Sequence, residues 1–310
     1  MISVVIPVKD GGAGLVRCLE AIAGQRVDEE IEVVVVDSGS RDGSVEAARA
    51  LGASVHEIDA AEFGHGRTRN LGASLARGQT LVFTSQDAYA ADAGWLAALA
   101  APLGRSEHVA GVYGRQLPHA DATPPERYFL DFLYGPHERV QSWSGPGEPT
   151  FEQTLFSNVN AAVPRGIWSE LPFADDLIMS EDQEWSRRAL LSGKTLVYAP
   201  RAAVFHSHAY TVASAFRRFF DSGVSAERSY ASGGAAPGSA LRSAAARYAK
   251  GELEWLWSTG QRRWIPYTAA YELAKFTGLQ LGRRHRRLPT SLKRRLSALP
   301  AYWDEPVQPD

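Results

Sequence analysis

The sequence contains one cysteine, Cys18, and no long apolar segment. A single cysteine excludes an internal disulfide and a thiolate zinc cluster, which leaves the redox compartment open and favours a reducing cytoplasm. No run reaches the about 18 apolar residues that mark a membrane-spanning helix. The N-terminus enters an apolar run directly, without the basic segment of a signal peptide. We therefore expect a cytoplasmic protein with no spanning helix.

The sequence also has no large excess of positive or negative charge, because the net charge is −2 over 310 residues. A balance this close to zero argues against a generally basic nucleic-acid-binding protein. The charge is nevertheless unevenly spread, since residues 241–300 hold 13 Lys or Arg and three Glu, which leaves −12 on the rest of the chain. Hydrophobic residues make up 45% of the chain, which is enough for a folded core. The sequence thus indicates an acidic body with a basic C-terminal part.

Short apolar runs alternate with helical patterns in the N-terminal third of the chain. Residues 31–36 are β-branched almost throughout, which is typical of a strand covered on both faces. We expect strands over residues 2–8, 31–36, 55–58 and 80–84, and helices over residues 15–22, 44–51 and 67–76. This alternation predicts an α/β fold with a Rossmann-like, mostly parallel, doubly wound sheet and helices on both faces.

Polar residues follow several of these strands, at the edge where such sheets bind ligands. Asp37 and Ser38 end the second strand, and a carboxylate there can accept hydrogen bonds from a base or a ribose. The same Asp-Ser-Gly sequence is also typical of an Asx turn or a helix N-cap that needs no ligand. Both interpretations remain open on this motif alone.

A glycine-rich loop at residues 63–66 runs straight into a helix that carries Arg67 and Arg69. Helix N-terminal amides and guanidinium groups together form an anion site. The loop does not match the dinucleotide-binding fingerprint, because Arg69 stands where that pattern needs Gly or Ala. A solvated basic first turn is the alternative. Cations at a helix N-terminus oppose the macrodipole, however, so a bound anion explains the two arginines better.

Three residues are candidates for a metal site. Asp87 follows the strand over residues 80–84 and can give one carboxylate to a divalent cation, with phosphate oxygens and water completing the shell. Its alternative role is to cap the helix that begins near Gly94. His206 and His208 are two residues apart in an extended segment, so their side chains lie on the same side of it. Either can ligate a metal or contact phosphate there. A buried histidine is also commonly structural.

A further motif concerns a candidate general base. Ser180 and Gln183 fit the Ser-x-x-Gln capping box, which places Asp182 in the first turn of a helix. There the helix dipole favours the ionised carboxylate, and a group with an ordinary pKa of about 3.9 is already deprotonated at neutral pH. Asp182 can therefore act as a general base. A plain acidic first turn is the commoner meaning of such a motif.

Five segments in this order and spacing resemble the family 2 glycosyltransferases of the GT-A type, over about residues 1–230. They are Val4–Val8, Val36–Gly43, Gly66–Ala73, Ser85–Ala88 and Ser180–Asp182. The sequence Phe63-Gly64-His65-Gly66, with Gln86-Asp87-Ala88, is most similar to the rhamnosyltransferase-like branch. That branch uses dTDP-rhamnose to build surface polysaccharides and related glycans.

The resemblance implies an inverting, metal-assisted transfer of a single sugar. The donor would be a nucleoside-diphosphate sugar, dTDP-rhamnose or a UDP-sugar, and the acceptor a hydroxyl of a glycan or of a lipid-linked sugar. The implied cofactor is Mg²⁺ or Mn²⁺. Ser85 stands where the family has the first Asp of its Asp-x-Asp motif, which bears on metal affinity. The Gln-x-x-Arg-Trp motif of processive synthases is missing, which favours a single transfer over polymerisation.

The resemblance also assigns roles to individual residues. Asp182 would be the catalytic base, and we expect it to face the same pocket as Asp87. The remaining implied sites are Pro7, Asp37, Ser38, Arg67, Arg69, Gln86 and Asp87 for the donor, Asp87, His206 and His208 for the metal, and Glu181 and Trp185 for the acceptor.

The C-terminal part has its own composition. Residues 232–239 read as a linker, which divides the chain into a catalytic domain over residues 1–231 and a basic helical extension over residues 232–310. The segment Trp264–Gly282 is an apolar helix bracketed by arginines. It can lie on an anionic membrane, at the inner face of the cell membrane. It can equally pack on the catalytic domain or form a homodimer interface.

Other functions fit parts of the sequence. A sugar nucleotidyltransferase would carry an N-terminal glycine-rich pyrophosphate loop, which Lys9–Gly14 imitates poorly. A non-catalytic module that binds a sugar nucleotide or a glycan would have no need of Asp87 and Asp182. A nucleic-acid role for the Arg-rich tail is the third alternative, and no nucleic acid is expected as a partner.

Overall fold

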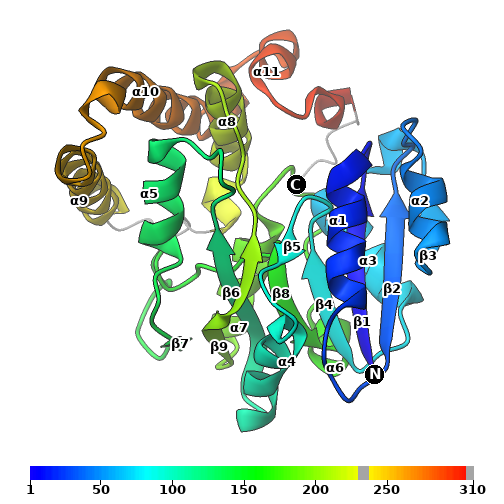
Figure 1. Cartoon of the computed structure of the whole chain (residues 1–310). Helices are drawn as coiled ribbons and strands as arrows, with labels where there is room; N and C mark the ends of the chain where they lie inside the picture. Colours follow the sequence, from blue (N-terminus) through cyan, green and yellow to red (C-terminus); the bar gives the residue numbers. More distant parts are fainter. Residues whose placement is uncertain (230–236, 305–310) are drawn as a thin grey trace.

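The computed structural model describes residues 1–229 and 237–304, and it places one mixed sheet between layers of helices (Figure 1). The strands are β1 (Ile2–Val8), β2 (Ile31–Asp37), β3 (Ser54–Glu57), β4 (Thr80–Thr84), β5 (Tyr89–Ala90), β6 (Val109–Leu117), β7 (Arg139–Gln141), β8 (Asn160–Pro164) and β9 (Thr195–Phe205). The helices are α1 (Gly12–Ala23), α2 (Ser44–Ala50), α3 (His65–Leu75), α4 (Trp95–Ala100), α5 (Pro124–Leu133), α6 (Arg165–Glu170), α7 (Glu181–Leu191), α8 (Val212–Ser229), α9 (Pro237–Ser258), α10 (Ile265–Gly282) and α11 (Thr290–Leu296).

The strand order is β3-β2-β1-β4-β8-β6-β9-β5, with β7 beside β9. Strands β3, β2, β1 and β4 are parallel, whereas β8 runs antiparallel to both of its neighbours. Strands β5 and β7 run antiparallel to β9. The predicted α/β fold is thus confirmed. Its sheet is parallel in the N-terminal half and mixed in the other half.

Alternation along β1 builds both faces of the core. Val4 and Ile6 point to the side of α1 and belong to one apolar cluster, while Val5 points to the side of α3 and belongs to the other. Helix α3 lies so close to β1 that a Cβ on Gly72 would come within 2.4 Å of Val5 Cγ1. Only glycine allows this approach. The sheet is therefore covered on both faces, as its β-branched strands predict.

The start of α7 is as predicted, but its capping is not. Ser180 precedes the helix with a left-handed φ of 63°, and its side chain makes no capping hydrogen bond. The predicted capping box is therefore wrong. The Asp182 carboxylate accepts the Gln183 N–H at 2.9 Å instead, because an acidic first turn can satisfy a free amide from inside the helix. Asp182 remains in the first turn.

The C-terminal helices lie beyond the carboxyl ends of β2 and β9 (Figure 1). Helix α10 is in backbone contact with α8, where Cβ atoms on Gly278 and Gly282 would come within 2.4 and 2.0 Å of the Phe216 and Phe220 carbonyls. One face of α10 thus packs on α8, as one of the alternatives expects. The boundary at residues 231 and 232 lies outside the described residues, and residues 237–239 of the expected linker begin α9. No helix in the described residues has the length and apolar character to cross a bilayer.

Candidate active site

A cavity of about 680 Å³ is lined by residues that follow β4 and β9, by the start of α7, and by α3, α5, α8 and α10. Asp87, Arg69, Glu181 and Asp182 line it, together with His206 and His208. Asp87 and Asp182 therefore open into the same cavity. The cavity lies at the carboxyl ends of strands, where ligands bind in sheets of this class.

Pairing between β5 and β9 places Asp87 beside the two histidines. Tyr89 pairs with Phe205 in an antiparallel register. The pairing therefore brings the loop before β5, which carries Asp87, beside the segment after β9, which carries both histidines. Because alternate residues of an extended segment share a side, both imidazoles reach the same carboxylate. A strand of two residues therefore assembles the cluster.

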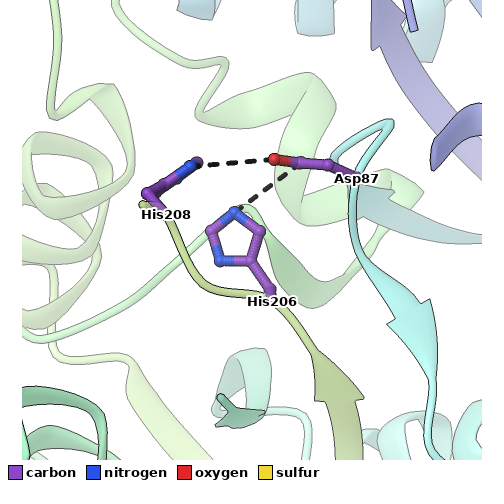
Figure 2. Close-up of side chains that lie close together, drawn as sticks. All are labelled: Asp87, His206 and His208. Carbon is purple, nitrogen blue, oxygen red and sulfur yellow. Dashed lines mark ion pairs between the residues drawn. The ribbon is translucent and has the colours of Figure 1, made fainter. Parts of the chain in front are cut away.

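The three side chains converge, as Figure 2 shows. His206 Nε2 lies 3.7 Å from Asp87 Oδ1, and His208 Nδ1 lies 3.8 Å from Asp87 Oδ2. One ligand atom from each residue falls within 4.8 Å of the others. His206 Nδ1 contacts Gln116 Oε1 at 2.9 Å, and since an amide oxygen only accepts, Nδ1 carries the proton. The Nε2 lone pair is then free to face Asp87.

Burial keeps both histidines neutral. It lowers the pKa of His206 to about 3, with help from the neighbouring His208. The pKa of His208 is also lowered by burial, which outweighs the opposing charge of Asp87. Neutral imidazoles and a carboxylate are metal ligands, and a hydrogen bond to the second ring nitrogen is the usual support of such a ligand. The cluster therefore fits a divalent cation.

Asp87 does not take the alternative role of a helix cap, because Gln25 Oε1 accepts the N–H of Leu96 in the first turn of α4 at 3.0 Å. Asp92 Oδ1 accepts the Gly94 N–H at 2.7 Å, at the start of α4. Asp87 is left with 42% of its side chain exposed, at the cavity.

A second group of charges lies at the start of α7. Glu181 Oε1 accepts a hydrogen bond from Arg69 Nη1 at 2.8 Å, and both side chains are under 10% exposed. Asn158 Nδ2 donates to the same Glu181 oxygen at 3.2 Å, and the Asn158 backbone N–H donates to Asp182 Oδ2 at 3.2 Å. Asn158 therefore fixes the two neighbouring carboxylates relative to one another.

Their environments separate the pKa values of these two acids. Burial opposes ionisation of Glu181, but the Arg69 and His65 charges outweigh it, so the pKa of Glu181 lies below its ordinary value. Burial and the Glu181 charge raise the pKa of Asp182 to about 7. The expectation that Asp182 has an ordinary pKa near 3.9 is therefore wrong. A carboxylate that titrates near neutrality is suited to accept a proton and release it.

Arg218 lines the cavity as well and was missed by sequence reasoning. Its positive charge acts on both His206 and His208. Its Nη1 is buried and has no hydrogen-bond partner among the residues that the structure describes. A buried guanidinium nitrogen without an acceptor is costly unless a ligand supplies one. Its only sequence signal is its position ten residues after His208, on a helix with an apolar face.

Six of the sequence-predicted residues do not line the cavity, and Arg67 and Trp185 are two of them. Arg67 is exposed, since the geometry of α3 turns it away from Arg69. Trp185 is 0% exposed, packs against Phe156 and Phe173, and donates its indole N–H to the Leu171 carbonyl at 2.8 Å. The expectation that Trp185 meets the acceptor is wrong, because its side of α7 faces the core.

The other four are predicted donor residues that lie at or just after the ends of β1, β2 and β4, namely Pro7, Asp37, Ser38 and Gln86. The Asp37 carboxylate is fully buried and accepts the N–H groups of Gly39 and Ser40, which is the Asx-turn alternative. Ser38 donates its hydroxyl to the Val8 carbonyl at 3.0 Å. Gln86 bonds to both backbone groups of Lys9, and this ties the loop that carries Asp87 to the end of β1. Pro7 is half-buried.

Comparisons with known proteins agree with this geometry. Residues 3–160 match the model of the family described as "Glycosyl transferase family 2". The chain is 33% identical to the O-antigen chain rhamnosyltransferase RfbN of Salmonella typhimurium, over 98% of this chain and 96% of that protein. It is 31% identical to the O-antigen chain rhamnosyltransferase WbaN of Salmonella anatum, over 90% and 88%.

Among solved structures, the fold is similar to that of the mannosyltransferase PcManGT from Pyrobaculum calidifontis, solved in complex with GDP-Man and Mn²⁺. The TM-score is 0.59 at 18% identity, over 90% of this chain and 86% of that chain. At this level of identity the likeness concerns the fold.

Proposed function

Because the chain belongs to glycosyl transferase family 2, we propose that it transfers one sugar from a nucleoside diphosphate to a hydroxyl group, with inversion at the anomeric carbon. The observation that carries this proposal is the shared cavity. It holds a candidate cation site, Asp87 with His206 and His208, and a candidate base, Asp182, whose pKa is near 7. Donor diphosphate and acceptor hydroxyl can therefore meet in one chamber.

The relatives support a choice of sugar and acceptor. RfbN and WbaN are named O-antigen chain rhamnosyltransferases. We therefore propose rhamnose as the transferred sugar, dTDP-rhamnose as its donor, and a glycan hydroxyl, carried on a lipid-linked sugar, as the acceptor. The nucleoside would lie along Pro7 and the Asp37 turn, beyond Asp87.

A divalent cation would be held by Asp87, His206 and His208. One carboxylate with two imidazoles favours Mn²⁺ over Mg²⁺, because imidazole is a poorer ligand for the harder ion. When bound, the ion supplies positive charge beside the oxygens of the departing diphosphate. Gln116 holds His206 in the tautomer that such binding needs.

The protein's own side chains would carry the proton and orient the carboxylates. Asp182 accepts the proton of the acceptor hydroxyl while that oxygen forms its bond to the anomeric carbon. The bond from the anomeric carbon to the diphosphate oxygen breaks on the opposite face, and the electron pair leaves with the nucleoside diphosphate. Arg218 faces the negative charge that this creates. Arg69 pairs with Glu181 and acts as a positioning residue for that acid.

The proposed binding of the nucleoside diphosphate and the cation can be tested with a panel of nucleotides. A thermal-shift series with dTDP, UDP and GDP, each with and without Mn²⁺, should show stabilisation that needs both nucleotide and ion. A ligand at 100 times its dissociation constant adds about 2.7 kcal/mol to the free energy of unfolding. We expect dTDP to give the largest shift.

Arg218→Gln should weaken nucleotide binding at least about tenfold, because a charged hydrogen bond to the diphosphate is lost.

Arg228→Gln is the matched control, since Arg228 lies on the same helix, outside the cavity, and pairs with Asp176 on the surface. It should bind dTDP as wild type does. Equal shifts with and without Mn²⁺, or wild-type binding by Arg218→Gln, would contradict the proposed donor site.

The pH dependence tests the role of Asp182. A base must be ionised to act, so kcat/KM should fall below a pH near 7, where the raised pKa of Asp182 lies. Glu181→Gln removes the negative charge that helps to raise this pKa and should move the acidic limb to lower pH. The two acids titrate as a pair, so the limb reports an apparent value. Glu170→Gln, an exposed change outside the cavity, should leave the limb in place. If kcat/KM stayed constant between pH 5 and 8, Asp182 would not be the base, because its pKa of about 7 lies inside that range.

A further inference from the structure

Helix α10 exposes a row of apolar side chains on the side that faces away from α8. Its inner face packs on α8 and buries Tyr271 and Lys275, along with Thr268, Gly278 and Gly282. The opposite face is exposed and carries Pro266, Ala269, Ala270, Leu273, Phe276 and Leu281. Leu273 is 63% exposed and Phe276 is 55% exposed. Within the helix, the outer face carries no charged side chain, and Thr277 and Gln280 are the polar residues that helical geometry places on it.

Basic side chains bracket this outer face. Arg262 and Arg263 precede α10, and Arg283, Arg284, Arg286 and Arg287 follow it, all of them exposed. Residues 262–296 contain ten Lys or Arg and one acid, Glu272. The Glu272 carboxylate accepts a hydrogen bond from Lys275 Nζ at 2.7 Å and so belongs to the inner side of the helix. The apolar face therefore sits between two clusters of positive charge.

An aromatic side chain extends this surface at the N-terminal end of α10. Trp257, at the end of α9, is 58% exposed. The guanidinium carbon of Arg262 lies 3.7 Å from the centre of its ring. Exposed Trp beside Arg is typical of a protein surface that meets lipid headgroups.

We propose that the outer face of α10 docks on the surface of an anionic lipid bilayer, with Leu273 and Phe276 entering the headgroup boundary and the flanking arginines contacting lipid phosphates. Each basic residue near such a surface adds about 1 kcal/mol of attraction, and apolar side chains supply the rest. The helix lies along the bilayer and does not cross it, because Glu272 and Lys275 would have to enter the hydrocarbon.

A second copy of the chain fits this face less well. If two α10 helices paired side by side, either direction would bring arginines against arginines, since both ends of the helix are basic. Like charges placed opposite one another oppose such pairing. An anionic bilayer offers the complementary charge at both ends at once.

Docking in this way would bring the cavity close to the membrane. Tyr271 and Lys275, on the inner face of α10, line the cavity. The bilayer surface would then lie about one helix diameter, 10–12 Å, from the cavity wall. A lipid-linked acceptor could reach the cavity over that distance. This consequence rests on the proposed function, whereas the docking itself does not.

Flotation of the full chain with vesicles tests the proposal. We expect binding at low salt to vesicles of phosphatidylcholine and phosphatidylglycerol at a ratio of about two to one, weak binding to phosphatidylcholine alone, and release at high salt. Leu273→Gln with Phe276→Gln should lower partitioning at least about tenfold, because two exposed apolar side chains no longer enter the bilayer. Arg283→Gln with Arg284→Gln should lower it on anionic vesicles alone.

Val140→Gln is the matched control, since Val140 is also 63% exposed but lies on β7. It should float as wild type does, and circular dichroism should show all variants folded. Absence of flotation at low salt would overturn the proposal. So would equal flotation of wild type and the Leu273/Phe276 variant. A folded protein whose dimer, measured by sedimentation, is lost on changing Leu273 and Phe276 while no vesicles bind would assign the face to a second copy instead.

Discussion

Asp182→Asn is expected to lower the rate of sugar transfer about 10³-fold while leaving donor binding nearly unchanged. The variant keeps the shape of the side chain and an oxygen that can accept the Asn158 N–H. It cannot take up the proton of the acceptor hydroxyl, so the attacking oxygen stays weakly nucleophilic. The measurement is the initial rate of transfer from dTDP-rhamnose to a lipid-linked glycan, beside calorimetric binding of dTDP with Mn²⁺.

Asp175→Asn provides a matched control, because Asp175 is exposed on the segment before α7 and does not line the cavity. Its rate should equal that of wild type. If Asp182→Asn retains more than about a tenth of the wild-type rate, Asp182 is not the general base, since such groups contribute 10²-fold or more. Loss of donor binding in parallel with the rate would instead point to a structural role.

Loss of the cation is the second large effect. Removal of divalent ions by a chelator, or the substitution Asp87→Ala, should lower transfer about 10³-fold, because each pair of unit charges about 4 Å apart is worth roughly 4 kcal/mol at an effective dielectric of 20 before desolvation. Added Mn²⁺ should restore the wild type more fully than Mg²⁺. Asp87→Ala should need far more Mn²⁺, since two histidines remain as ligands.

The control for this experiment is Asp92→Asn, which alters a nearby aspartate that accepts the Gly94 N–H in the turn before α4. Its dependence on Mn²⁺ should match that of wild type. Full activity in the presence of chelator would show that the cluster of Asp87, His206 and His208 serves another purpose. Full activity of Asp87→Ala would do the same.

The first half of the fold could be predicted from the sequence. Residues 2–8 and 31–37 are β-branched runs closed by polar turns, and such runs have few ways to bury themselves other than in a parallel sheet. The antiparallel part could not, because β5 has two residues and β8 follows a long segment of mixed pattern. Yet the brief β5–β9 pairing is what brings Asp87 beside the two histidines.

Residues of the candidate site could be predicted where the motif that indicates them lies within one short segment. Asp87, Asp182, His206 and His208 each follow a strand or open a helix, so their exposure at the cavity follows from the pattern of their own segment. Contacts between distant segments were not predictable. Arg69 and Glu181 are 112 residues apart, and the sequence does not show that they form a buried ion pair.

The other wrong predictions concern which side of a helix is buried. Trp185 and Asp182 belong to one predicted helix, but nothing local indicates that the Trp185 side enters the core, where it is fully buried. In α10 the inner face buries Lys275 while the outer face exposes Leu273 and Phe276, so hydrophobicity alone does not show which face packs on α8. The close approach at Gly278 and Gly282 settles the inner face. In the sequence, two glycines four residues apart, Gly278 and Gly282, are the one feature that indicates where another helix packs against α10.

The arrangement of the cavity can be tested most directly by anomalous diffraction from crystals grown with Mn²⁺ and dTDP. The account predicts one Mn²⁺ ligated by Asp87, His206 and His208, with diphosphate oxygens in its shell, Arg218 against the diphosphate, and the Asp182 carboxylate facing the space beyond it. A manganese ion held elsewhere, or a diphosphate bound away from these three ligands, would contradict it.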